Sequence, residues 1–242
     1  MEIRVADPAE SKRFYETVFA PLGIETEHDE GWLVEWDDFS ISAADEEHPP
    51  TRNLHVGFVA PSREHVDEFW RAGTRAGYAD DGEPGPRPQY RDDYYGSFLR
   101  DPDGNSAEAV HHGDVREPGH IDHLWIRVAD VAAATRFYRT IEPYSGFAFA
   151  HERDGLAHFR GRGGSFSLVG DGGDATERVH VAFPAGENAT VDAFHRAAME
   201  AGYRDHGGPG ERPQYHAGYY GAFVLDPDGN NVEVVCHNRR SA

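Results

Sequence analysis

The sequence contains few of the features that mark secreted or membrane proteins. Cys236 is the only cysteine among 242 residues, so no disulfide can form within the chain. The N-terminal residues show no basic segment followed by an apolar one. The mean hydropathy is -0.68, and no long apolar run is present. These absences predict a cytoplasmic protein with no membrane span and no secretory signal.

Basic residues are also scarce. Lysine and arginine number 23 against 43 aspartates and glutamates, the formal net charge is -20, and Lys12 is the only lysine. Because phosphate binding needs a basic surface, this charge argues against a nucleic-acid partner. It would favour a cationic ligand, but the simpler interpretation is a solvated acidic surface that keeps the protein soluble.

An internal duplication is the strongest pattern in the chain. Residues 212–233 repeat residues 87–108, and well over half of the aligned positions are identical. Each copy is typical of a strand, an Asp-Pro-Asp-Gly-Asn turn and a second apolar strand with one acid, Glu108 or Glu233. A buried carboxylate in such a strand needs a partner, and a metal ion is one candidate.

The remainder of each half repeats as well. Asp7 and Asp130 each precede an apolar stripe and predict an N-capped helix. Second helices are expected from near Ser62 and Asn188, each ending at an Ala-Gly-Tyr sequence in which Gly favours a helix stop.

The order strand, helix, strands occurs four times, which predicts an α+β fold. We expect two domains, at residues 1–113 and 120–242, joined by a polar linker at residues 113–119.

With these residues in view, the chain resembles the vicinal oxygen chelate superfamily of glyoxalases, bleomycin-resistance proteins, fosfomycin-resistance transferases and extradiol dioxygenases. The resemblance covers nearly the whole chain. It is carried by His-Leu-Trp-Ile-Arg-Val-Ala-Asp at residues 123–130, His-Val-Ala-Phe at 180–183 and the Asp-Pro-Asp-Gly-Asn turns followed by Glu. It implies four βαβββ modules that form two glyoxalase-like domains, with curled mixed β-sheets around a metal-containing cavity.

The resemblance also implies a ligand set. Its three metal positions fall on His123, His180 and Glu233. Two imidazoles and one carboxylate, with positions open for substrate, suit Fe(II), Mn(II) or Zn(II). Such a metal would hold two neighbouring substrate oxygens and stabilise an enolate or similar anion.

A second grouping stays open. His55 and Glu108 match His180 and Glu233, whereas aligning Val5 with Val128 places the first half's third ligand before Met1. If modules are exchanged between the halves, His123 joins His55 and Glu108 instead. We prefer the self-contained C-terminal site, because consecutive elements usually pack together. A chain that starts upstream of Met1 would restore a second first-strand ligand.

The chemistry is less defined by the sequence. We assign catalytic roles to Glu233, Tyr220 and His216 in a metal-dependent, lyase- or dioxygenase-like enzyme acting on a small molecule. The second carboxylate of metal-dependent glyoxalases is missing from residues 166–169, and Phe223 stands where ring-cleaving dioxygenases carry Tyr. The rival hypothesis is a non-catalytic, bleomycin-resistance-like binding protein that needs no metal. Either protein would be a monomer or a homodimer.

Overall fold

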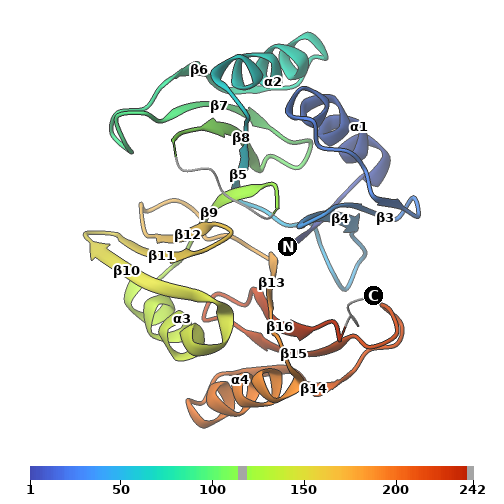
Figure 1. Ribbon diagram of the computed structural model, residues 1–242, viewed down its shortest axis with the longest axis vertical. Coiled ribbons are helices and arrows are strands. Elements are labelled where there is room, and N and C mark those ends of the chain that lie inside the picture. The colour runs from blue at the N-terminus through green and yellow to red at the C-terminus, as the bar shows by residue number, and fades with distance from the viewer. Residues whose placement is uncertain (114–118, 239–242) are drawn as a thin grey trace. The chain divides into compact units, whose positions relative to one another are not determined.

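The computed structural model describes residues 1–113 and 119–238, and its elements repeat in the predicted order (Figure 1). The first module comprises β1 (Glu2–Val5), α1 (Pro8–Phe19), the 3-10 helix η1 (Ala20–Leu22), β2 (His28–Asp29), β3 (Leu33–Trp36) and β4 (Phe39–Ala43). The second comprises β5 (Leu54–Val59), α2 (Arg63–Arg75), β6 (Asp80–Pro86), β7 (Tyr95–Arg100) and β8 (Ser106–His111).

The second half repeats this order. Its first module comprises β9 (Ile121–Arg127), α3 (Val131–Ser145), β10 (Phe147–Arg153), β11 (Leu156–Gly161) and β12 (Ser165–Val169). The last comprises β13 (His180–Pro184), α4 (Asn188–Glu200), β14 (Arg204–Glu211), β15 (Tyr220–Leu225) and β16 (Asn231–Cys236). The α+β class and the four βαβββ modules are confirmed. Residues 114–118 of the expected linker lie outside the described residues.

The helix termini follow the sequence signals. The Asp7 carboxylate accepts hydrogen bonds from the backbone N–H groups of Ala9 and Glu10, each at 3.0 Å, and caps α1. Asp130 caps α3 in the same way, through the N–H of Ala133. After α2, Gly77 adopts a φ of 92°, a left-handed conformation that ends the helix at low cost.

The described residues divide into two compact units. The first comprises residues 1–113, 119–126 and 163–166, and the second comprises residues 127–162 and 167–238. In the first unit the strand orders are β1-β4-β3-β2 and β9-β5-β8-β7-β6. Both are mixed: β5 runs parallel to β8, whereas β7 and β9 run antiparallel to their neighbours. In the second unit β13 runs parallel to β16, and β15 and β14 follow antiparallel.

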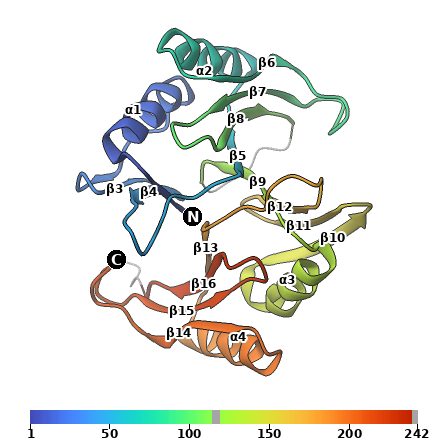
Figure 2. The ribbon, with the colours of Figure 1, turned by 180° about the vertical axis from the view of Figure 1, so that it is seen from behind.

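Strand β9 therefore pairs with β5 of the preceding module (Figure 2). The β-sheet around β5 includes the first strand of the next module, so β9 and β8 lie on either side of β5. This pairing decides which ligand candidates can meet.

The cores are aromatic. In the first unit Phe19, Trp36, Phe39 and Phe58 are almost completely buried. Phe19 meets Trp36 and Phe58 edge to face, Phe39 meets Phe58 in the same way, and Trp36 stacks on Phe39. Burying a side chain of this size stabilises the fold by roughly 1.5–3 kcal/mol. The second unit has a similar cluster of buried rings, in which Tyr138 contacts Phe137 and Phe159.

The repeated turn ties the candidate ligand strands together. Asp101 accepts hydrogen bonds from the backbone N–H groups of Asp103 and Asn105 at 2.9 and 2.8 Å and from the Tyr15 hydroxyl at 3.0 Å. The Asn105 side-chain oxygen accepts from the N–H of Leu54 at 3.2 Å. The turn before β8 is thus fixed to the start of β5, one residue before His55.

No helix among residues 1–113 and 119–238 has the length and apolar character needed to cross a membrane.

Candidate metal centre

Three neighbouring strands bring together two histidines and a glutamate. His55 lies on β5, Glu108 on β8 and His123 on β9. In the strand register Gly57 is opposite both Glu108 and His123, so these two residues flank the same point of β5 from either side. His55 precedes Gly57 by two residues and therefore points to the same face.

Glycines provide the space for these side chains. A Cβ atom at position 57 would overlap the His123 imidazole, and one at position 96 on β7 would overlap a carboxylate oxygen of Glu108. Neither glycine has a positive φ. Their role is therefore close approach: the missing side chains leave room for the buried functional groups.

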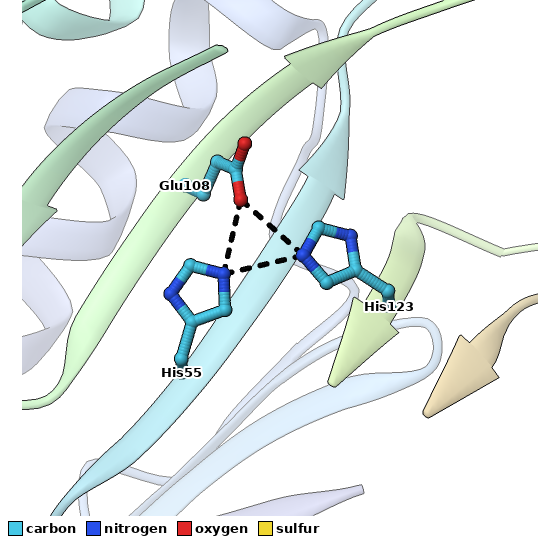
Figure 3. Close-up of side chains that lie close together, drawn as sticks. All are labelled: His55, Glu108 and His123. Carbon is cyan, nitrogen blue, oxygen red and sulfur yellow. Dashed lines mark hydrogen bonds and ion pairs between the residues drawn. The ribbon is translucent and has the colours of Figure 1, made fainter. Parts of the chain in front are cut away.

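The ligand atoms converge on one point (Figure 3). His55 Nε2 lies 3.0 Å from Glu108 Oε2, His123 Nε2 lies 3.3 Å from the same oxygen, and the two nitrogens are 3.2 Å apart. Glu108 and His123 are buried, and the His55 side chain is 12% exposed. Among residues 1–113 and 119–238 this is the group of three metal-binding side chains that the geometry brings together.

Each histidine is oriented through its other ring nitrogen. Asp122 Oδ1 lies 2.9 Å from His123 Nδ1, and its second oxygen lies 2.9 Å from Nε2 of buried His112. His55 Nδ1 lies 3.0 Å from the Ser106 oxygen, whose hydroxyl donates to Asp81 at 2.8 Å. Both contacts favour a proton on Nδ1 and leave the Nε2 lone pairs facing Glu108.

The other oxygen of the Glu108 carboxylate is held by a tyrosine. The Tyr94 hydroxyl donates to Glu108 Oε1 at 2.7 Å, so Oε2 remains for the two histidines. Burial, followed by the charge of Glu108, raises the pKa of Tyr94 well above its usual value. The phenol therefore stays protonated and keeps donating.

Glu108, His123 and His55 shift one another's pKa values. Burial acts to raise the pKa of Glu108, but hydrogen bonds with His123 and His55 outweigh it and lower that pKa to about 2. Burial acts to lower the pKa of His123, but Asp122 and Glu108 raise it to about 9. For His55 burial prevails, and its pKa falls. Without a metal, the cluster therefore carries a proton, shared between His123 and Glu108.

The structure forms the second of the two groupings that the sequence left open. His123, which we expected beside His180 and Glu233, lies instead with His55 and Glu108 in the first unit. The preference for consecutive packing does not hold at this site, because β9 pairs with β5.

His180 and Glu233 do meet each other in the second unit. His180 Nε2 lies 2.9 Å from Glu233 Oε2, and the Tyr219 hydroxyl donates to Glu233 Oε1 at 2.6 Å. This pair repeats the contacts of His55, Glu108 and Tyr94. The group of three formed by the described residues, however, is the one around Glu108.

The two other residues expected to be catalytic lie apart from Glu233. The Tyr220 hydroxyl donates to Asp192 at 2.8 Å on an exposed surface, so it is the neighbouring Tyr219 that reaches the glutamate. His216 stacks on His237, with a nitrogen–nitrogen distance of 2.8 Å, and its ring lies 5.3 Å from that of Tyr219. Neither Tyr220 nor His216 forms a hydrogen bond with Glu233, whose partners are His180 and Tyr219.

Sequence reasoning missed the residues that support the ligands. Tyr94 could have been found, because Tyr219 occupies the matching position of the repeat. Ser106 and Asp81 have no such signal, because the second copy carries Asn231 and His206 at their positions. The Gly57 position is also informative: the second copy has Ala182 there, opposite Glu233, with a side chain where the first copy has none.

Comparisons with known proteins agree with this fold. The family model for the Glyoxalase/Bleomycin resistance protein/Dioxygenase superfamily matches residues 1–109 and 120–234. The crystal structure of glyoxalase I from Zea mays aligns with a TM-score of 0.68 at 19% identity, over 98% of this chain and 90% of that one. A candidate dioxygenase from Bacillus subtilis aligns with a TM-score of 0.64 at 14% identity, over 99% and 84% of the two chains.

No curated protein sequence matches this chain. The two structural likenesses concern the fold, and the family model covers nearly the whole length in two copies. The chain belongs to the Glyoxalase/Bleomycin resistance protein/Dioxygenase superfamily.

Proposed function

We propose that the chain is a metal-dependent enzyme of the vicinal oxygen chelate type, with its centre at His55, Glu108 and His123. The observation that carries this proposal is the convergence of three ligand atoms within 4.8 Å of one another at the meeting point of β5, β8 and β9. The donor set is two imidazoles and one carboxylate, which suits Fe(II), Mn(II) or Zn(II).

The separations of the ligand atoms fit a metal ion. With bonds of about 2.1 Å, ligands at 90° to one another lie about 3.0 Å apart, and tetrahedral ligands lie about 3.4 Å apart. The observed separations are 3.0, 3.2 and 3.3 Å. A metal held by these three residues would keep positions open for substrate, as in iron-dependent oxygenases with two histidines and one carboxylate.

The electron pairs also support a cation. Because Nδ1 of each histidine has its own acceptor, both Nε2 lone pairs and Glu108 Oε2 face one another. Three acceptors at this distance repel unless a proton or a metal lies among them. The Nδ1 contacts with Asp122 and Ser106 would also hold the rings in place as ligands.

When bound, the metal would supply Lewis acidity to two neighbouring oxygens of a small molecule and stabilise the negative charge that develops on them. The protein residues have supporting roles. Tyr94 keeps Glu108 Oε1 occupied, so the carboxylate presents Oε2 alone. Asp122 and Ser106 keep the imidazoles in the tautomer that can bind, and Gly57 and Gly96 keep the space open.

Lactoylglutathione lyase chemistry is less well supported than oxygenase-type chemistry. The group of metal-binding side chains has three members in the described residues, whereas the family's metal-dependent glyoxalases add a second carboxylate. Phe98, like Phe223, occupies the position of the tyrosine found in ring-cleaving dioxygenases, so an extradiol reaction would need another proton donor.

Non-catalytic binding is the second candidate. The net charge of -20 suits sequestration of a cationic molecule, which requires no metal. A metal titration of the chelator-treated chain separates the two functions. The enzyme hypothesis predicts about one Fe(II), Mn(II) or Zn(II) per chain, lost in His55→Ala and kept in His180→Ala. A wild-type chain that binds none of these metals contradicts it and favours sequestration.

A further inference from the structure

A row of aromatic rings extends from the candidate ligands towards solvent. Trp125 follows His123 by two residues on β9 and therefore lies on the same face. Its ring centroid is 5.8 Å from that of His55, and the Tyr90 ring is 5.5 Å from Trp125. Exposure increases along this row: Glu108 is buried, Trp125 is half-buried, and Tyr90 is 42% exposed.

Tyr94 connects the row to the carboxylate. Its ring lies 5.2 Å from that of Tyr90, and its hydroxyl donates to Glu108. We refer to Tyr90, Tyr94 and Trp125 as the aromatic wall. Trp125 lies beside His55, and Tyr94 donates to Glu108, so the aromatic wall borders the three candidate ligands on two sides.

Tyr90, at the outer end of the aromatic wall, is exposed and is therefore not a core residue. Trp32, Tyr90 and Tyr215 are the exposed large hydrophobic residues in the described part of the chain, and Tyr90 and Tyr215 occupy equivalent positions of the repeat. Each contacts the tyrosine that holds its copy's glutamate. An exposed ring beside a functional group is a surface that a ligand can cover.

The charged groups around the wall do not favour an anionic ligand. Arg91 pairs with Asp93 at 2.7 Å, and Arg100 pairs with Asp81 at 2.6 Å. Arg87 donates to the Glu83 carbonyl and lies over the Phe98 ring. These guanidinium groups already have partners, whereas Asp81, Asp122 and Glu108 add negative charge near the ligands.

We propose that the aromatic wall selects substrates in which the two vicinal oxygens are attached to a flat, uncharged ring system. A ring bound next to the metal would stack on Trp125 and leave its far edge against Tyr90. An anionic substrate would find the guanidinium groups of Arg87, Arg91 and Arg100 already engaged by other partners. This inference rests on the proposed metal centre and adds the class of substrate to it.

Two hydroxamates test the inference. Benzohydroxamate and acetohydroxamate both chelate through two neighbouring oxygens and differ in carrying a phenyl ring or a methyl group. Their dissociation constants are measured by calorimetry on the Zn(II)-loaded full chain, with zinc content determined by elemental analysis. We expect benzohydroxamate to bind about tenfold more tightly, as stacking and ring burial together predict.

Variants assign that preference to the wall. Trp125→Leu should reduce the preference to about twofold or less, and Trp125→Phe, which keeps a ring, should retain most of it. Trp32→Leu serves as control, because Trp32 is exposed and hydrogen-bonds to Glu30 on the β2–β3 connection.

The outcomes are distinguishable. Equal binding of the two hydroxamates to zinc-loaded wild type would contradict the selection by the aromatic wall, and so would an unchanged preference in zinc-loaded Trp125→Leu. Neither result would contradict the proposed metal centre. A wild-type chain that takes up no zinc would contradict both the proposed metal centre and the proposed selection by the aromatic wall.

Discussion

Gly57 on β5 lies opposite His123 on β9, and its missing side chain leaves the space that the imidazole fills. The relationship is specific to the first copy of the repeat. In the second copy Ala182 occupies the equivalent position opposite Glu233. At this position the two strands thus differ by one methyl group, and the first copy has the space that an imidazole needs.

Gly57→Ala should remove metal binding while the fold is kept. The new Cβ would overlap the His123 ring and force it away from Glu108, and losing one of three ligands should weaken metal binding by a factor of at least about 100. Metal stoichiometry measures the effect, and circular dichroism checks the fold. The matched variant Ala182→Gly should keep the metal and lose no more than about 1 kcal/mol of stability. Full metal content in Gly57→Ala would show that His123 is not a ligand.

Asp122→Asn should weaken metal binding without removing a ligand. The carboxylate accepts from His123 Nδ1 and holds the ring in its binding tautomer, and such supporting partners are typically worth 10- to 100-fold in affinity. Competition with a fluorescent chelator gives the dissociation constant. Asp192→Asn is the control, because that carboxylate accepts from Tyr220 on an exposed surface and should have no effect on affinity.

The stability of the metal-free protein should depend on pH at both ends of the range. The pKa of His123 is raised to about 9, so its contribution is complete below pH 6.5 and is lost as the pH rises through about 9. The pKa of Glu108 is lowered to about 2, so its contribution is present above pH 4.5 and is lost as the pH falls through about 2.

Urea unfolding of chelator-treated protein measures this dependence. Between pH 6.5 and pH 9.5 the free energy of unfolding should fall by up to about 3 kcal/mol, since each pKa unit corresponds to about 1.4 kcal/mol. The pKa shifts of His123 and Glu108 both arise from the interaction between these two residues, so their contributions to the free energy of unfolding are not independent. His123→Gln should show a smaller decrease over the same interval. An equal decrease in the variant would assign the effect to other groups.

The fold could be predicted from the sequence because local signals and duplication agree. Asp7 and Asp130 cap the helices as expected, and the Asp-Pro-Asp-Gly-Asn turns precede the glutamate strands. The candidate residues on the glutamate strands and their partners can also be identified, because His55 and Glu108 stand at the same positions of the repeat as His180 and Glu233.

The grouping of those residues could not be predicted in the same way. Which histidine meets which glutamate depends on the pairing of β9 with β5, a contact between modules that neither hydrophobic pattern nor turn chemistry determines. The Gly57 and Ala182 difference was visible in the sequence, but its meaning depends on knowing that His123 lies opposite. Likewise, strand alternation requires one of Tyr219 and Tyr220 to face outward, and the structure assigns that position to Tyr220.

Elemental analysis of Glu108→Gln and Glu233→Gln tests the central claim most directly. The two glutamates occupy equivalent strand positions, and each is paired with one tyrosine and one histidine of its own copy. The two variants therefore differ in which copy loses its carboxylate. The centre at His55, Glu108 and His123 predicts about one divalent metal per chain in wild type and in Glu233→Gln, and almost none in Glu108→Gln. Metal retained in Glu108→Gln and lost in Glu233→Gln would contradict it and place the site in the C-terminal copy.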